Sequence, residues 1–185
     1  MVEPPPAGLD MCAALVEYDE AGRELVLALK YRNHRQALPF LGHALARLAT
    51  DACSATALGQ PGLVTWAPTS SARRRGRGFD QAHLLARATA TALGLPAVSV
   101  LRRVGGAPQT GAPVEKRLRG PRFVVCASAP VIAGPVVVVD DVVTTGATLS
   151  AAARALRDAG FGPVAGVVVA RTELKIGACR ADERN

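Results

Sequence analysis

The amino-acid sequence predicts an α/β protein with a central, mostly parallel sheet flanked by helices. Two apolar runs carry this prediction: residues 136–139, which are four consecutive valines, and residues 164–170. Such runs without polar alternation are typical of parallel strands buried on both faces. Between the two runs lies an amphipathic segment whose apolar residues recur at helical spacing: Leu149, Ala152, Ala153 and Leu156.

Length and composition fit one globular domain. The chain has 185 residues, of which 49% are hydrophobic and only 4% aromatic, so we expect a core built mainly from Ala, Val and Leu. There is no run of 18 apolar residues and no basic segment followed by an apolar one at the start, so neither a membrane span nor a secretory signal is expected.

The cysteines and histidines form no metal-ligand pattern. The four cysteines are far apart and contain no C-x-x-C pair: Cys12, Cys53, Cys126 and Cys179. This spacing argues against a zinc site and a disulfide scaffold, so we expect no metal held directly by cysteine or histidine. Free thiols favour a cytoplasmic location.

The net charge of +7 has two competing explanations. The excess of basic residues favours either the steering of a polyanionic small substrate or the binding of nucleic acid. Both explanations remain open from charge alone.

The N-terminal part is expected to hold a lead-in and two helices. Residues 1–14 are predicted to be a flexible lead-in rich in proline. Residues 15–58 should contain a short extended piece, a helix that presents Leu25, Val26 and Leu29 on one face, and a second helix that caps the sheet. The apolar stripe predicted for this second helix is Phe40, Leu41, Ala44, Leu45 and Leu48.

The core is predicted over residues 59–174, with a polar tail over residues 175–185. Residues 63–67 read as a strand, and a helix from about residue 79 to residue 93 should end at Gly94. The loop between them carries hydroxyls, two glycines and four arginines, which are suited to phosphate oxygens. The alternative is a basic surface patch or a nucleic-acid patch.

Residues 98–101 are predicted to form a further strand, and residues 102–122 lose apolar periodicity. A loop this long inside a compact domain is usually functional. Its glycines and basic residues are typical of a lid that closes over a polyphosphate, although a disordered insertion is the alternative. Residues 123–125 are expected to resume the sheet.

The most informative stretch begins where the valine run ends. Asp140 and Asp141 stand side by side at the predicted end of a strand, where open α/β sheets bind ligands. Adjacent carboxylates are good acceptors for a vicinal diol. The hydroxyl-rich loop of residues 144–148 then opens a helix, which makes it a ready anion cradle. The pair therefore predicts a ribose 5-phosphate site, whereas the alternative is an ordinary turn capped by Thr148.

The chain resembles the ComF family of competence-associated phosphoribosyltransferase-like proteins. Residues 136–149 resemble the loop of type I phosphoribosyltransferases that binds phosphoribosyl pyrophosphate (PRPP). The segment of residues 77–81, Arg-Gly-Phe-Asp-Gln, narrows the resemblance to ComF-like proteins, together with residues 27–31, 101–103 and 108–111. The resemblance runs from about residue 15 to residue 172.

The resemblance implies a type I phosphoribosyltransferase fold of about five parallel strands with a small N-terminal helical hood. It implies that Asp140 and Asp141 bind the ribose diol as the catalytic pair. The remaining implied sites are the 5-phosphate loop, Thr144, Thr145, Gly146, Ala147 and Thr148; the pyrophosphate loop, Thr69, Ser70, Ser71, Arg73 and Arg77; the flexible lid, Arg102, Arg103, Gln109 and Arg117; and Arg171 beside the base.

The implied reaction is the displacement of pyrophosphate from PRPP by a nitrogenous base, with Mg²⁺ as the cofactor. The chain departs from the family in two respects. Many ComF-like proteins begin with a cysteine-rich zinc module that this chain lacks, and residue 80 is Asp where Asn is common.

A second function remains open from the sequence. The protein is either an enzyme or a non-catalytic PRPP- or nucleic-acid-binding protein linked to DNA uptake and competence. Single-stranded DNA is a partner under the second hypothesis, although the few aromatic residues weaken it. A nucleotide fold of the G-x-G-x-x-G or P-loop kind is excluded because neither motif is present. The acceptor base and a homodimer are left open, and no membrane partner is expected.

Overall fold

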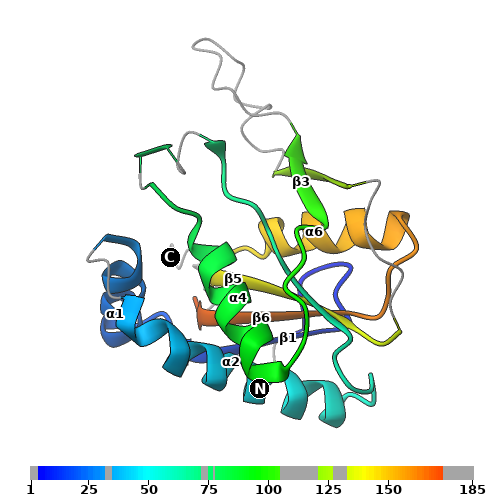
Figure 1. Cartoon of the computed structure of the whole chain (residues 1–185), viewed down its shortest axis with the longest axis horizontal. Coiled ribbons are helices and arrows are strands. Elements are labelled where there is room, and N and C mark those ends of the chain that lie inside the picture. The colour runs from blue at the N-terminus through cyan, green and yellow to red at the C-terminus, as the bar shows by residue number, and fades with distance from the viewer. Residues whose placement is uncertain are drawn as a thin grey trace, which may run out of the picture.

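The computed structural model describes residues 4–31, 35–71, 75–76, 78–104, 121–126 and 133–172. Arg73, Arg77, Gln109 and Arg117 lie outside these residues, as do most of the predicted lid and the predicted polar tail. Figure 1 shows the helices arranged around a central sheet.

Four parallel strands form the central sheet in the order β1-β6-β5-β2. They are β1 (Met11–Glu17), β6 (Val164–Arg171), β5 (Val136–Val143) and β2 (Leu63–Trp66). All of β2 and the first four residues of β5 are buried, as expected for parallel strands covered on both faces. The prediction of an α/β protein with a mostly parallel sheet flanked by helices is confirmed.

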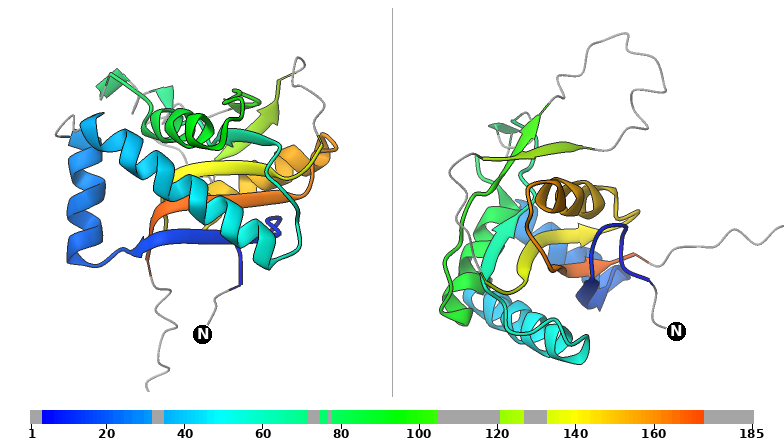
Figure 2. Two further views of the ribbon diagram at one scale, coloured as in Figure 1. Left: turned by 60° about the horizontal axis from the view of Figure 1, so that its bottom comes forward. Right: turned by 90° about the vertical axis from the view of Figure 1, so that its right-hand side faces the viewer.

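The two faces of the sheet are covered by different helices. One face packs against α1 (Glu20–Tyr31), α2 (Leu38–Ala55) and α4 (Gln81–Leu93), and the opposite face packs against α6 (Ala147–Asp158). Figure 2 shows the sheet between α2 and α6. Alternate residues of β5 serve the two cores: Val137 and Val139 face α2 and α4, whereas Val136 and Val138 face α6. The valine run is thus explained by burial on both sides.

The apolar stripe predicted for α2 is only partly right. Leu45 is fully buried, but Phe40 is 79% exposed. The buried face instead uses small residues, and a Cβ on Gly42 would come within 2.6 Å of Ala88 in α4. Close approach of the two helices therefore selects small side chains, which a search for large apolar residues overlooks.

The strand that follows α4 differs from the prediction. Residues 96–98 add only a short parallel bridge to β2, through Val64 and Ala97. The strand β3 (Leu101–Val104) pairs instead with β4 (Arg122–Val125) in a separate two-stranded antiparallel ribbon. The expectation that residues 123–125 resume the central sheet is therefore wrong. The ribbon buries Leu101 and Phe123 against the α6 side of the core.

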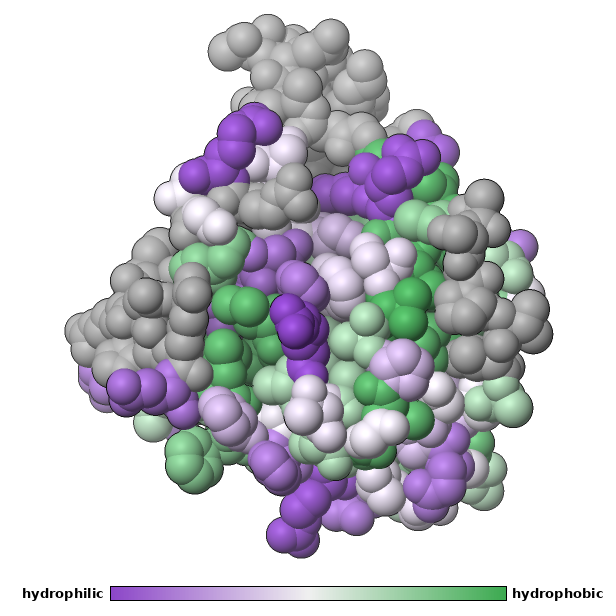
Figure 3. Space-filling view, viewed as in Figure 1, coloured by the Kyte–Doolittle hydropathy of each residue, from purple (hydrophilic) through white to green (hydrophobic). Residues whose placement is uncertain are grey.

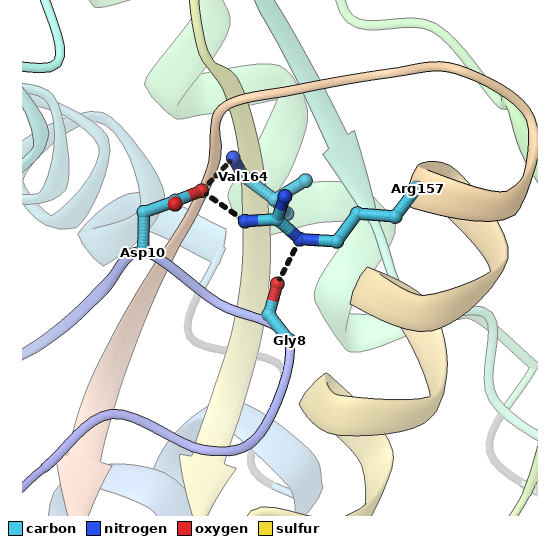
Figure 4. Close-up of polar contacts among 4 residues, drawn as sticks. All are labelled: Gly8, Asp10, Arg157 and Val164. Atoms are coloured by element: carbon cyan, nitrogen blue, oxygen red, sulfur yellow. Dashed lines mark hydrogen bonds and ion pairs between the residues drawn. The ribbon is translucent and has the colours of Figure 1, made fainter.

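The N-terminal segment is ordered earlier than predicted. The lead-in was expected to reach residue 14, but β1 begins at Met11, and both Leu9 and Met11 are buried. A clasp of Gly8, Asp10, Arg157 and Val164 holds this segment to α6 and β6 (Figure 4). Asp10 Oδ2 accepts hydrogen bonds from the Arg157 guanidinium at 2.6 Å and from the Val164 N–H at 2.7 Å, while Arg157 Nε donates to the Gly8 carbonyl at 2.7 Å.

The described helices include none that is both long and apolar enough to cross a lipid bilayer. The face drawn in Figure 3 mixes hydrophilic and apolar residues, and hydrophilic residues lie at its centre as well as along its edges.

Candidate functional site

The candidate site lies where two neighbouring strands end. After β2 the chain turns to α4 on one face of the sheet, and after the adjacent β5 it turns to α6 on the other face. Connections that leave neighbouring strands toward opposite faces open a crevice at the carboxyl edge, and ligands of open α/β sheets bind in such crevices. The topology alone thus makes this edge of the sheet a candidate ligand-binding site.

A cleft of about 320 Å³ occupies this position. It draws its lining from the ends of β1, β2 and β5, from β3, and from the first turns of α4 and α6. The lining residues are Tyr18, Ala67, Thr69, Asp80, Gln81, Ala82, Arg103, Asp140, Asp141, Val142, Thr144 and Thr148. Most of them carry polar side chains, so the cleft suits a small, hydrophilic ligand.

The predicted carboxylate pair lies in this cleft. Asp140 and Asp141 are half-buried near the end of β5, immediately after four buried valines. The Asp141 N–H donates to Asp140 Oδ1 over 2.8 Å, which orients the first carboxylate. Both residues line the cleft, where a ligand with adjacent hydroxyl groups would meet them.

The predicted phosphate loop connects β5 to α6. Gly146 is the N-cap of α6 and has a φ of +72°, a left-handed conformation that favours glycine. Thr144 and Thr148 line the cleft, whereas Thr145, Gly146 and Ala147 do not. The N–H groups in the first turn of a helix lack intrahelical acceptors and attract anions. The loop therefore brings two hydroxyls and a helix N-terminus to the cleft.

The loop after β2 is joined to α4 by one carboxylate. Asp80 is the N-cap of α4: its Oδ1 accepts from the His83 N–H at 3.4 Å, and its Oδ2 accepts from the Thr69 N–H at 3.0 Å. Thr69 lines the cleft, Ser70 is half-buried, and Ser71 is exposed. Among the predicted pyrophosphate residues that are described, Thr69 therefore has the clearest place in the site.

The two predicted lid arginines that are described belong to β3 and differ in position. Arg103 lines the cleft and stacks over the Phe123 ring, with 5.8 Å between the guanidinium carbon and the ring centroid. Arg102 points to the other side of the ribbon and is exposed. The period of two along a strand separates these neighbours, so of these two arginines Arg103 is the one that adds positive charge to the cleft.

Arg171, predicted to lie beside the base, does not line the cleft. It ends β6, and its guanidinium donates to the Cys12 carbonyl over 3.1 Å. Burial raises the pKa of the Cys12 thiol, although the nearby Arg171 charge acts in the opposite direction. The thiol is therefore protonated at neutral pH and is not a ready nucleophile.

Six lining residues are not among the predicted site residues. Three of them are apolar, Ala67, Ala82 and Val142, and three are polar, Tyr18, Asp80 and Gln81. Asp80 and Gln81 belong to the Arg-Gly-Phe-Asp-Gln segment that was noted in the sequence, and an Asp before a helix is a recognisable N-cap signal. Tyr18 follows β1, the edge strand on the far side of β6 and β5. Only the strand order reveals that it reaches the same cleft.

The cleft residues are compatible with a Mg²⁺ ion that is bound together with the substrate phosphates. Within the described ranges, no group of three or more His, Cys, Asp or Glu side chains is arranged to hold a metal ion. Mg²⁺ usually keeps several waters and binds through one or two carboxylates together with substrate phosphates. Asp140 and Asp141 offer the hard oxygen ligands that such a substrate-borne ion needs.

No protein-family model matches this chain, and no curated protein matches it significantly.

Proposed function

We propose that the protein is a type I phosphoribosyltransferase, similar to the ComF family, that binds PRPP with Mg²⁺ and transfers its phosphoribosyl group to a nitrogenous base. The observation that carries the proposal is the meeting of Asp140, Asp141, Thr148 and Thr69 in one cleft at the switch point of a parallel sheet. A diol acceptor and two phosphate-binding loops are the elements that PRPP requires.

Each part of the cleft has a role in this mechanism. Asp140 and Asp141 accept hydrogen bonds from the ribose hydroxyls and hold the sugar in a fixed orientation. This fixed orientation lowers the entropy cost of the reaction. The first turn of α6 and the hydroxyls of Thr144 and Thr148 anchor the 5-phosphate. Thr69 and Arg103 face the pyrophosphate, where positive charge and hydrogen-bond donors stabilise the leaving group.

The nitrogen of the base forms a bond to the anomeric carbon of the ribose as the C–O bond to pyrophosphate breaks, and positive charge develops on the sugar. The electron pair of the C–O bond leaves with pyrophosphate, and the nitrogen gives up its proton to solvent. When bound, Mg²⁺ supplies charge neutralisation for the departing pyrophosphate. The carboxylates beside the sugar favour the developing positive charge. An enzyme of this kind would work in the cytoplasm, where its thiols stay reduced.

The test is the double substitution Asp140→Asn with Asp141→Asn. Neutral amides replace both charged acceptors, so we expect Mg²⁺-dependent PRPP binding to fall below detection in titration calorimetry. Asp158→Asn is the matched control, because Asp158 is an exposed carboxylate at the far end of α6. Unchanged PRPP binding in a folded double variant would contradict the site assignment.

Turnover needs its own measurement. Release of pyrophosphate should be followed with PRPP, Mg²⁺ and a panel of purine and pyrimidine bases. Release that depends on one base identifies the acceptor and establishes an enzyme. PRPP binding without release for any base would favour the non-catalytic alternative.

A further inference from the structure

Gln81 is an unusual residue within the cleft. It is the first residue of α4 and is only 5% exposed, yet its Oε1 has no hydrogen-bond partner in the part of the chain that the structure describes. A buried acceptor without a donor is unfavourable, and native proteins rarely keep one without a reason. Since Gln81 lines the cleft, a bound ligand is the natural source of the missing donor.

The side chain can turn toward such a ligand at low cost. The terminal torsion of a glutamine is broad and roughly two-fold, and no described donor holds Oε1 in its present orientation. The neighbouring Asp80 is different, because both of its carboxylate oxygens already accept backbone N–H groups. Among these side-chain acceptors at the start of α4, Gln81 Oε1 is therefore the one that lacks a donor.

The need for a hydrogen-bond donor indicates which of the two substrates contacts Gln81. If the proposed function is correct, PRPP brings hydrogen-bond donors only in its two ribose hydroxyls, and all its other polar atoms are acceptors. Asp140 and Asp141 are the acceptors that suit those hydroxyls. The second substrate, in contrast, is a nitrogen nucleophile and carries N–H groups.

We propose that Gln81 is a specificity-determining residue. Its Oε1 accepts a hydrogen bond from an N–H group of the second substrate, the base that receives the phosphoribosyl group, which is a flat nitrogen heterocycle. Tyr18 lines the same cleft and supplies an aromatic surface on which a flat ring can stack. This inference rests on the proposed function. A site built to accept an N–H group discriminates against analogues that lack it.

The variant that tests the proposal is Gln81→Met, which keeps length and volume but removes the acceptor. Thr65→Val is the matched control. Thr65 is also fully buried and its Oγ1 also lacks a partner among the described residues, but it does not line the cleft. Removing an unpartnered buried polar group should raise Tm in both variants, by about 2–4 °C.

The selectivity of base binding distinguishes Gln81→Met from Thr65→Val. Calorimetry should measure PRPP with Mg²⁺ first, and then, with PRPP present, purine and pyrimidine bases and their N-methylated forms. Wild type and Thr65→Val are expected to prefer one unmethylated base over its N-methylated form by about tenfold. In Gln81→Met this preference should disappear, while the affinity for PRPP alone stays unchanged.

The outcomes distinguish this inference from the proposed function. A wild-type protein that does not bind PRPP contradicts both. PRPP binding without preference for any unmethylated base overturns the inference about Gln81 alone. The same conclusion follows if Gln81→Met weakens PRPP binding in the absence of a base, since the partner of Oε1 would then belong to PRPP or its hydrated Mg²⁺. A lower Tm in Gln81→Met would indicate a structural residue and also overturn it.

Discussion

At the scale of single residues, the Asp80 carboxylate joins two parts of the candidate site. Its two oxygens serve two different backbone segments, the start of α4 and the loop after β2. An amide has only one oxygen, so an Asn in the same orientation would accept one of these two N–H groups and turn its NH₂ group toward the other. The negative charge at the helix N-terminus is a further, smaller benefit.

Asp80→Asn tests this double role. We expect the variant to fold with a free energy of unfolding lower by about 0.5–1.5 kcal/mol, because one backbone hydrogen bond is lost. The affinity for PRPP should fall as well, since Thr69 is no longer held at the cleft. Urea unfolding and calorimetry measure the two effects. Wild-type values for both would show that the bond between Asp80 and Thr69 does not organise the loop.

At the scale of elements, the start of α6 combines two constraints on one glycine. Gly146 has a left-handed backbone, and a Cβ at this position would lie 2.8 Å from Pro6 of the N-terminal segment. The proposed phosphate loop is therefore shaped by its own backbone and also supported from outside by a segment that is 140 residues away in the sequence.

Gly146→Ala and Gly94→Ala form a matched pair. Gly94 ends α4 with a φ of +67°, but a Cβ there would meet nothing within 4 Å. Alanine should cost about 1–2 kcal/mol at Gly94 from backbone strain alone, and more at Gly146 because Pro6 must also move. Chemical denaturation measures both.

PRPP binding gives the same pair a second readout. Of these two variants, only Gly146→Ala should weaken the binding of PRPP, because Gly146 belongs to the proposed 5-phosphate loop and Gly94 does not. Equal destabilisation of the two variants would indicate that Pro6 yields freely. Equal PRPP affinities would contradict the role assigned to the loop.

At the scale of the whole molecule, the clasp of Gly8, Asp10, Arg157 and Val164 joins the beginning of the described chain to its last helix and strand. The clasp links residues 147 to 154 positions apart. The ion pair is partly exposed, with 42% of the Arg157 side chain accessible, so its charges contribute little. The larger contribution is the acceptor that Asp10 provides for the Val164 N–H.

Asp10→Ala should lower the free energy of unfolding by about 1–3 kcal/mol, because the half-buried Val164 N–H loses its acceptor. Asp158→Ala removes an exposed carboxylate next to Arg157 and should change stability by less than about 0.5 kcal/mol. Thermal or urea unfolding of both variants gives the comparison. Similar stabilities for the two would mean that the clasp does not hold the N-terminal segment.

The sequence by itself determined the class of fold and the centre of the candidate site. Residues 136–139 predict a strand buried on both faces, and the structure shows this strand in a parallel sheet. Asp140, Asp141 and the following loop were also identified from sequence alone. Such features are local: strand burial, a strand end and a helix start are encoded within about 15 neighbouring residues.

Tertiary structure alone decided which distant residues share the cleft. Strand order brings Tyr18 to the carboxylate pair. The packing of α4 and of the β3–β4 ribbon brings Gln81 and Arg103 to the same cleft, whereas Arg102 and Arg171 stay outside its lining. The tertiary structure also pairs β3 with β4 away from the central sheet, against the prediction. These choices depend on which surfaces pack together across the whole chain, and no local pattern of residues carries that information.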